Sequence, residues 1–229
     1  MILPIRDHNP RSRFPVATVG LVLANTAVFL LSLLLSPDVQ AELLRRGGAI
    51  PLEVTTLVDL PPRDLVAPPF TILTSMFLHG GLWHLLGNMW FLWIFGDNVE
   101  DRMGSWKFVG FYLLTGVVGA VSQSLLMPSS PIPMVGASGA VAGVLGGYVL
   151  QFPRARIVSL LLFFRVSVPA WVFVVLWFTA QLFLVHHSGI AWMAHVGGFL
   201  AGLGLVRLFI VPRPIPAVDV DYLPPPSRR

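Results

Sequence analysis

Two residues in apolar surroundings carry side chains that could perform chemistry together. Ser138 lies in the stretch Gly136-Ala137-Ser138-Gly139, and His195 lies in a later apolar segment. A serine hydroxyl becomes an effective nucleophile only when a neighbouring base, such as an imidazole, takes its proton. Ser138 and His195 are therefore candidates for nucleophilic acyl transfer.

A third apolar segment holds two further polar side chains, His84 and Asn88. Their spacing of four residues places both on one side of a helix, where they could donate hydrogen bonds to an oxyanion. Each candidate also has a structural interpretation. A serine between glycines often serves helix packing, a single histidine can bond a carbonyl, relay protons or bind a metal, and His84 and Asn88 could hold two helices together.

The composition indicates a protein that crosses a membrane several times. Of 229 residues, 55% are hydrophobic and 11% charged, and the mean hydropathy is +0.77, which exceeds what one soluble core of this length needs. The chain has no cysteine, which excludes disulfides, thiolate metal ligands and a thiol nucleophile. The net charge of +4 does not indicate a nucleic-acid partner, because the lysines and arginines are scattered singly.

The hydrophobic pattern predicts an all-α membrane protein with six transmembrane helices. We expect a cytoplasmic tail over residues 1–15, a six-helix membrane domain over 16–211 and a disordered tail over 212–229. The spans are expected at 16–35, within 70–97, and at 108–127, 138–151, 168–185 and 189–211, with an amphipathic helix at 39–46, a charged turn at 97–107 and a basic turn at 153–165.

The fourth predicted segment is too short to cross a bilayer completely. Its fourteen residues, 138–151, would rise by about 21 Å at about 1.5 Å per residue, whereas the hydrocarbon core is about 30 Å thick. Ser138 should therefore lie below one membrane face, under irregular backbone at 128–137. Such backbone is tolerated in a membrane where protein shields it or where it lines a watery cavity, which a hydrolase would need.

Small residues repeat every four positions on the fourth and sixth predicted segments. The repeats are Ser138, Ala142 and Gly146, then Gly139, Gly143 and Gly147, and finally Ala194, Gly198 and Gly202. Helices in lipid associate through close packing, which such stripes permit. We therefore expect these two segments to pack together and to bring Ser138 within reach of His195.

At these residues the chain resembles the rhomboid family of intramembrane serine proteases, in particular bacterial-type members with six spans. The resemblance covers roughly residues 70–211 and rests on four motifs: His84-Leu85-Leu86-Gly87-Asn88, Gly96-x-x-x-Glu100-x-x-x-Gly104, Gly136-Ala137-Ser138-Gly139 and Ala194-His195-x-x-Gly198. It implies a six-helix bundle in which Ser138 is the nucleophile and His195 the general base and acid. It also implies an oxyanion hole formed by His84, Asn88 and the backbone N–H of Ser138.

The resemblance implies an endopeptidase that cleaves transmembrane or juxtamembrane segments of membrane proteins and needs neither cofactor nor metal. Because a helical peptide hides its carbonyls from attack, we expect substrate helices that unwind easily. The oligomeric state is not predicted. No Asp or Glu occurs between Asp101 and Asp219, so no third acidic member of a catalytic triad is expected. Two features differ from the family pattern: Ala142 stands where many relatives carry an aromatic that packs on the catalytic histidine, and a Trp-Arg pair is missing near Phe70.

Three alternative functions belong to other classes. A catalytically inactive relative acting as a binding or trafficking factor should lack Ser138 or His195, and both are present. A transporter should show internal repeats or paired broken helices, and a membrane metalloprotease should carry a motif such as His-Glu-x-x-His. Neither pattern occurs in the sequence.

We expect four other polar residues to support structure or hydration: Glu100, His79, Ser122 and Gln123.

The positions of the basic residues predict the orientation in the membrane, since cytoplasmic segments carry an excess of Lys and Arg. With a cytoplasmic N-terminus and six spans, twelve basic residues lie inside and three outside. The inside set is Arg6, Arg11, Arg13, Arg102, Lys107, Arg154, Arg156, Arg165, Arg207, Arg213, Arg228 and Arg229, and the outside set is Arg45, Arg46 and Arg63. We expect a bacterial inner membrane, both termini in the cytoplasm and an active site that opens to the outer face.

The absence of cysteine makes single introduced thiols unambiguous probes of this topology. In intact cells, a thiol from Ser130→Cys should react with a membrane-impermeant maleimide, and one from Arg154→Cys should react only after permeabilisation. A thiol from Ser138→Cys should react more slowly than the first, because the reagent must enter a recessed cavity. Faster labelling at residue 154 than at residue 130 would invert the topology.

Overall fold

The computed structural model describes residues 2–61, 66–161, 163–188 and 191–211, and it contains nine helices and three strands in those ranges. The helices are α1 (Val16–Ser32), α2 (Pro37–Gly47), α3 (Pro51–Thr56), α4 (Pro68–Ser75), α5 (Leu82–Met103), α6 (Ser105–Leu126), α7 (Ser138–Gln151), α8 (Ala170–Ser188) and α9 (Trp192–Phe209). The strands are β1 (Ile2–Asp7), β2 (Arg156–Leu161) and β3 (Phe164–Pro169). The predicted tail at 212–229 lies outside the described residues.

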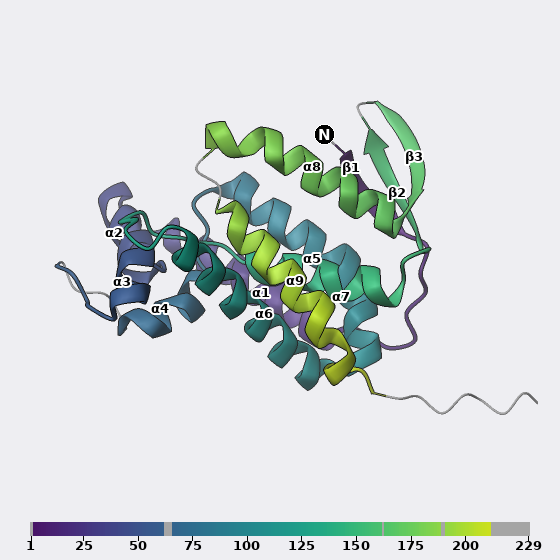
Figure 1. Ribbon diagram of the computed structural model, residues 1–229, viewed down its shortest axis with the longest axis horizontal. Coiled ribbons are helices and arrows are strands. Elements are labelled where there is room, and N and C mark those ends of the chain that lie inside the picture. The colour runs from purple at the N-terminus through teal and green to yellow at the C-terminus, as the bar shows by residue number, and fades with distance from the viewer. Residues whose placement is uncertain (1, 62–65, 162, 189–190, 212–229) are drawn as a thin grey trace, which may run out of the picture.

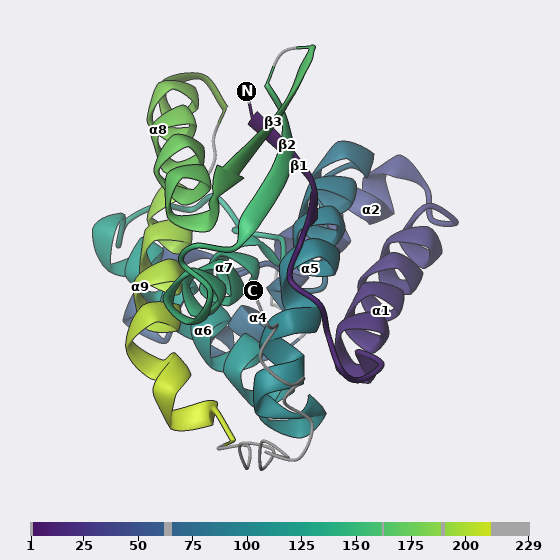
Figure 2. The same cartoon turned by 90° about the vertical axis from the view of Figure 1, so that its right-hand side faces the viewer.

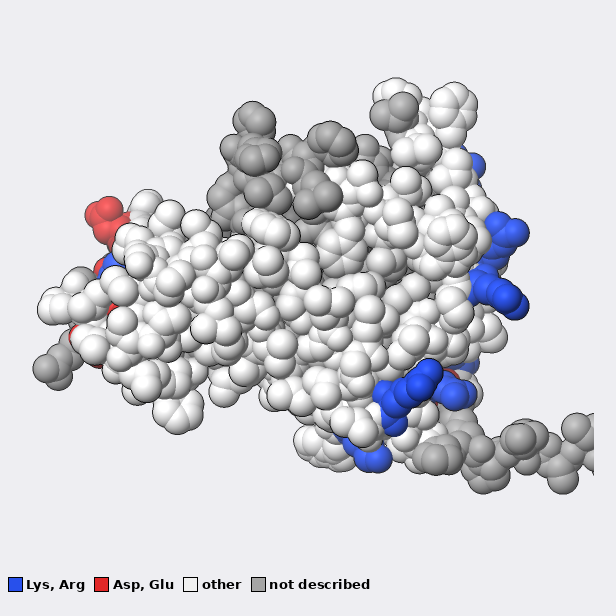
Figure 3. All heavy atoms as spheres, in the orientation of Figure 1, with Lys and Arg blue, Asp and Glu red and all other residues white. Residues whose placement is uncertain are grey.

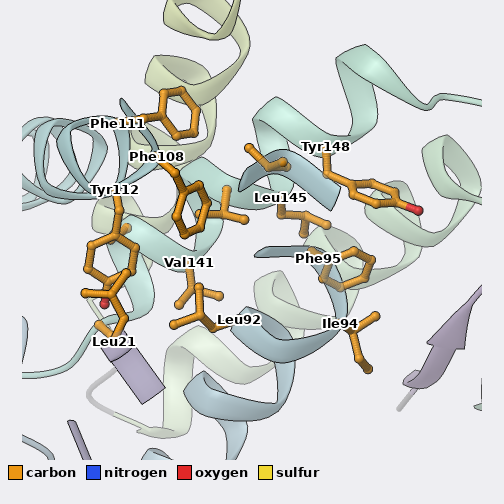
Figure 4. Close-up of a cluster of buried hydrophobic side chains, with 14 of the residues drawn as sticks. Leu21, Leu92, Ile94, Phe95, Phe108, Phe111, Tyr112, Val141, Leu145 and Tyr148 are labelled. Carbon is orange, nitrogen blue, oxygen red and sulfur yellow. The ribbon is translucent and has the colours of Figure 1, made fainter. Parts of the chain in front are cut away.

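Helix α7 lies at the centre of the molecule, with α5, α6 and α9 around it and α8 along one side (Figures 1 and 2). Every residue from Gly139 to Val149 is buried. Large apolar side chains of α7 and of the helices around it form the core (Figure 4), among them Leu21, Leu92, Phe95, Phe108, Phe111, Tyr112, Val141, Leu145 and Tyr148. The predicted bounds of this fourth segment are confirmed.

Two helices among the described residues are long and apolar enough to cross a membrane, α6 and α9. Helix α1 and the first part of α8 are apolar but shorter, and α7 has fourteen residues. Helix α5 has 22 residues, among them His84, Asn88 and Glu100. The structure is therefore mostly helical, as expected, whereas six complete spans are not established by helix length and composition.

The second predicted span begins differently from the expectation. Residues 68–75 form the short helix α4, and α5 begins only after a turn that contains Gly80 and Gly81. The charged turn expected at 97–107 is also wrong, because α5 continues to Met103 and α6 begins at Ser105. The two helices are separated by Gly104 alone, whose φ of +80° lies in the left-handed region that glycine adopts readily.

Glu100 connects the start of α1 to the junction of α5 and α6 through hydrogen bonds. Its carboxylate accepts hydrogen bonds from the backbone N–H groups of Ala17 and Thr18, at 2.9 and 2.7 Å, and from the hydroxyls of Thr18 and Ser105. The first N–H groups of a helix lack intrahelical acceptors and favour a negative charge. Glu100 thus anchors the start of α1 to the junction of α5 and α6, in agreement with the supporting role expected for it.

A three-stranded antiparallel sheet of order β1-β2-β3 corrects the expectation of an all-α fold. The segment interpreted as a basic turn at 153–165 contributes to a hairpin that leads directly into α8, and the segment interpreted as a tail supplies β1. Strand β1 is an edge strand with an irregularity between Pro4 and Arg6, a position that tolerates proline. It is fastened to the bundle, since Trp90 donates to the Pro4 carbonyl and Tyr148 to Asp7.

Asp7 makes the stability of this attachment depend on pH. Burial raises the pKa of the Asp7 carboxyl from 3.8 to about 6, although the hydrogen bond from Tyr148 opposes the rise. A raised pKa in the folded state adds stability at low pH, and that stability is lost as the pH rises through about 6. The melting temperature of the wild type in detergent should therefore fall as the pH rises from about 4 to about 6.5, and level off above that range.

Asp7→Asn should reduce that fall, because the amide carries no charge to desolvate and can still accept from Tyr148; the remaining fall is expected from Asp97, whose pKa burial also raises. Asp38→Asn, which changes an exposed carboxyl on α2, is the matched control and should leave the fall unchanged. Equal pH dependence in the wild type and in Asp7→Asn would contradict the assignment.

Candidate active site

Ser138 is the first residue of α7 and is half-buried. The backbone before it turns at Gly136, whose φ of +116° favours glycine, and the Gly136 N–H donates to the Ser75 carbonyl at 2.8 Å. Met134 pairs with Ala49 in an isolated bridge. The part of the loop next to Ser138 is thus held by the segments around α2 and α4, as expected of shielded irregular backbone, whereas Pro128, Ser129, Pro131 and Ile132 are exposed.

His84 and Asn88 both approach this loop from α5. A Cβ atom placed on Gly136 would lie 2.6 Å from Cε1 and Nε2 of His84 and 3.5 Å from Nδ2 of Asn88. Only a residue without a side chain leaves room for both groups. The structure therefore brings His84 and Asn88 to the backbone two residues before Ser138, as their spacing on one helix face predicted.

Two hydrogen-bond donors near Ser138 have no acceptor among the described residues. Asn88 is 7% exposed, and its Nδ2 is buried without a partner. The N–H of Ser138 belongs to the first turn of α7, where no side chain caps the helix. An unsatisfied buried donor costs about 1–3 kcal/mol, so this arrangement requires an explanation. Donors of this kind stabilise an oxyanion when a substrate supplies one.

The first turns of α7 and α9 are in direct contact. A Cβ atom on Gly198 would lie 2.0 Å from the Gly139 carbonyl oxygen, and one on Gly202 would lie 2.0 Å from the Gly143 carbonyl oxygen. The Ala194 carbonyl oxygen lies 3.4 Å from the Cβ position of Gly139. The predicted packing of the two small-residue stripes is confirmed, and the sequence neighbours of Ser138 and His195 touch.

Among the described residues, the His195 side chain is hydrogen-bonded to α8 and not to Ser138. Its Nδ1 is hydrogen-bonded to Oε1 of Gln181, and its ring lies 5.9 Å from that of Trp177 at an interplanar angle of 34°. No hydrogen bond between Ser138 and His195 occurs among the described residues. Hydrogen bonds between a nucleophile and its base are often long before substrate binds.

Gln181 and Trp177 are site residues that the sequence analysis missed. They are four residues apart on α8, so they face the same way. The available signal was the single glutamine in a span whose only other polar side chain, up to Val185, is Thr179. Trp177 supplies the aromatic contact that Ala142 cannot make, although it comes from a different helix.

The start of α9 is fixed by a third helix. Gln123 of α6 is 5% exposed, and its Oε1 accepts a hydrogen bond from the Met193 N–H at 3.0 Å. Gly197 faces Ser122, whose Oγ would lie 2.2 Å from a Cβ atom there. Gln123 and Ser122 thus position the turn that carries His195, as expected of supporting residues.

A small cavity of about 30 Å³ borders Ser138, between Ser75, Gly136 and Ala194. That volume holds on the order of one or two water molecules, which is enough for a hydrolytic water. A larger cavity of about 370 Å³ lies between α1, α2 and His79 and borders neither Ser138 nor His195. We associate the candidate site with the smaller cavity because it borders Ser138 and Gly136, the glycine that His84 and Asn88 approach.

His79 packs edge-on against His84, with ring centroids 5.2 Å apart, and neither of its ring nitrogens has a hydrogen-bond partner among the described residues. It therefore supports the position of the His84 ring through packing. No set of three His, Cys, Asp or Glu side chains in the described ranges is arranged to hold a metal ion.

Comparison with known proteins identifies relatives of this chain. Residues 68–212 match the family model of the Rhomboid domain. The chain is 35% identical over 149 residues to Rhomboid protein 1, mitochondrial, of Saccharomyces cerevisiae. The aligned region covers 62% of this chain and 42% of that protein. It is 32% identical over 220 residues to RHOMBOID-like protein 4 of Arabidopsis thaliana, covering 86% and 54%.

It is also 29% identical over 160 residues to Rhomboid protease GluP of Bacillus subtilis, covering 68% of this chain and 29% of that protein. The chain thus spans 29% to 54% of the length of these three relatives. The relatives include both mitochondrial and bacterial proteins, so the comparisons do not support the expectation of a bacterial inner membrane.

Two glycines of α9 provide a matched test of the α7–α9 contact. Gly198→Ala would place a methyl group against the Gly139 carbonyl and should lower the free energy of unfolding by about 1–3 kcal/mol. Gly204→Ala meets nothing within 4 Å and should be neutral or slightly stabilising. Unfolding in mild detergent measures both. Equal stability of the two variants would contradict the contact.

Proposed function

The chain belongs to the rhomboid family, and from this premise we propose that it is an intramembrane serine endopeptidase that cleaves transmembrane or juxtamembrane segments of membrane proteins. One observation carries the proposal. Two unpaired hydrogen-bond donors, Nδ2 of Asn88 and the N–H of Ser138, flank a serine at the start of a helix. The first N–H groups of any helix lack intrahelical acceptors, so the distinguishing feature is the buried, unpaired amide of Asn88 beside them, for which helix packing alone gives no reason.

The proposed mechanism uses Ser138 as nucleophile and His195 as base. Ser138 Oγ attacks the carbonyl carbon of the scissile peptide bond while its proton passes to Nε2 of His195. The carbonyl oxygen becomes an oxyanion, which accepts hydrogen bonds from Asn88, His84 and the Ser138 N–H. Collapse of this intermediate breaks the C–N bond, and Nε2–H of His195 protonates the leaving amine.

Water completes the reaction by attacking the acyl-enzyme ester while Nε2 of His195 accepts its proton. The ester C–O bond then breaks, and His195 returns the proton to Oγ of Ser138. The small cavity beside Ser138 has room for this water. A substrate carbonyl must be free of helical hydrogen bonds before Ser138 can attack it. We therefore propose that the preferred partners are membrane proteins whose transmembrane segments unwind easily.

The distribution of charge supports the proposed orientation. Most Lys and Arg side chains visible in Figure 3 lie at the end of the molecule that carries the sheet, and acidic side chains appear mainly at the opposite end, near α2. Since basic residues favour the cytoplasmic side, we place the sheet there and the Ser138 end toward the outer face. Of the basic residues counted in the sequence, Arg63, Arg213, Arg228 and Arg229 lie outside the described residues.

A catalytically inactive rhomboid-like factor for binding or trafficking remains the alternative. Such a protein could keep the bundle and the α7–α9 contact. It would not require a serine, a histidine and free donors at the same end of those helices. The alternative therefore leaves unexplained the features on which the proposal rests.

The graded loss of activity in four single variants and one double variant tests the proposal. Ser138→Ala and His195→Ala should each abolish cleavage of a reconstituted transmembrane substrate, and the double variant should add little because the two residues act as a unit. Asn88→Ala and His84→Ala should retain residual activity, since loss of one oxyanion donor costs about 10²–10³ in rate. Substrate fragments are quantified by mass spectrometry.

Labelling with a fluorophosphonate distinguishes the two functions directly. The wild type should be labelled at Ser138, and Ser138→Ala should not be labelled. An unchanged melting temperature of Ser138→Ala would show that the variant is folded. Full cleavage by a folded Ser138→Ala variant would show that another residue is the nucleophile. An unlabelled, inactive wild type would favour the binding function.

A further inference from the structure

The orientation of His195 has no carboxylate to explain it. No Asp or Glu occurs between Asp101 and Asp219, and Glu100 on α5 is engaged with α1 and Ser105. A serine protease base nevertheless needs a partner on its second ring nitrogen, because that partner decides which nitrogen carries the proton. In this structure the partner of Nδ1 is the side-chain carbonyl of Gln181.

We propose that Gln181 is the positioning residue of His195 and does by neutral hydrogen bonding what a carboxylate does in a Ser-His-Asp triad. The inference rests on the proposed function and deepens it. Oε1 of Gln181 can only accept a hydrogen bond, so Nδ1 of His195 must carry the proton. The lone pair is then on Nε2, the nitrogen that must accept the proton of Ser138.

The opposite arrangement would make the site inactive. If the Gln181 amide group donated to Nδ1, the single imidazole proton would lie on Nε2, where it blocks proton acceptance from a serine. The structure shows the productive arrangement: Oε1 of Gln181 faces Nδ1, and the amide nitrogen Nε2 is buried without a partner among the described residues. The bond to His195 is therefore the one hydrogen bond described for this side chain.

Gln181 also fits the charge changes of the reaction. When His195 receives the Ser138 proton it becomes an imidazolium with protons on both nitrogens. The Nδ1–H remains hydrogen-bonded to Oε1, whose dipole favours the positive charge, and no second proton is transferred. Trp177 packs against the same ring and restricts its tilt. The two α8 residues together fix the position, plane and tautomer of the base.

Few other groups can compete for control of His195. Helix α7 contains no titratable residue near Ser138, and the one charged residue of α6, Lys107, lies at the far end of that helix. His84 approaches from α5, while the side chains of His186 and His187 on α8 lie outside the described residues. Gln181 is thus the group in direct hydrogen-bond contact with the base.

The test compares Gln181→Ala, Gln181→Glu and Thr179→Ala by the rate of fluorophosphonate labelling at Ser138 and by the kcat and KM of substrate cleavage. Gln181→Ala should lower the labelling rate and kcat by about tenfold to a hundredfold, as loss of a histidine-orienting partner commonly does, with KM little changed. Thr179 lies on the same helix and donates to its own Val175 carbonyl, so Thr179→Ala should behave as the wild type.

Gln181→Glu provides the readout that a purely structural role would not alter. A carboxylate accepts from Nδ1–H as the amide carbonyl does, so labelling should be restored relative to Gln181→Ala. Because a carboxylate also favours the imidazolium, the rise of the labelling rate with pH should move to higher pH. Restoration together with this shift supports acceptance by residue 181.

Two results would overturn the inference while leaving the proposed function intact. One is Gln181→Ala labelling at the wild-type rate, and the other is Gln181→Glu remaining as slow as Gln181→Ala at every pH. If Gln181→Ala loses its melting transition, the pH profile of Gln181→Glu decides alone. Failure of the proposed function is recognised separately, by the absence of Ser138 labelling in the wild type.

Discussion

The contact between the backbones of α7 and α9 is the constraint on which the rest of the structure depends. Apolar side chains give little net drive for helix association in lipid, so the helices must gain from close packing. Gly198 and Gly202 face the carbonyls of Gly139 and Gly143 at distances that a methyl group would violate. This approach places the start of α7 beside the start of α9, and the short central helix is enclosed as a consequence.

The sequence predicted the elements whose signals are local and strong. The bounds of α7 followed from the residues between Ser138 and Gln151, and its contact with α9 followed from the four-residue glycine repeats. The approach of His84 and Asn88 to one loop followed from helical spacing. These features were predictable because each depends on periodicity within a single helix or on the small size of a residue.

Other features depend on partners that are distant in sequence. Strand β1 contains a proline and becomes a strand only because β2 lies beside it. Strand β3 did carry a signal, since Arg165 and Ser167 alternate with Val166 and Val168. The contact of Gln181 with His195 requires the placement of α8 relative to α9, which no periodicity within α8 reveals.

The pairing of β1 with β2 has a consequence for how the protein is made. Strand β1 leaves the ribosome before its partner β2, which follows about 150 residues later; at about 5–20 residues per second this is a delay of roughly 8–30 s. During this interval β1 has no strand to pair with, and the sheet can close only after α1 to α7 have been synthesised. Closure of the sheet is therefore a late step of biogenesis, and a β1 that pairs elsewhere would leave β2 as an unprotected edge.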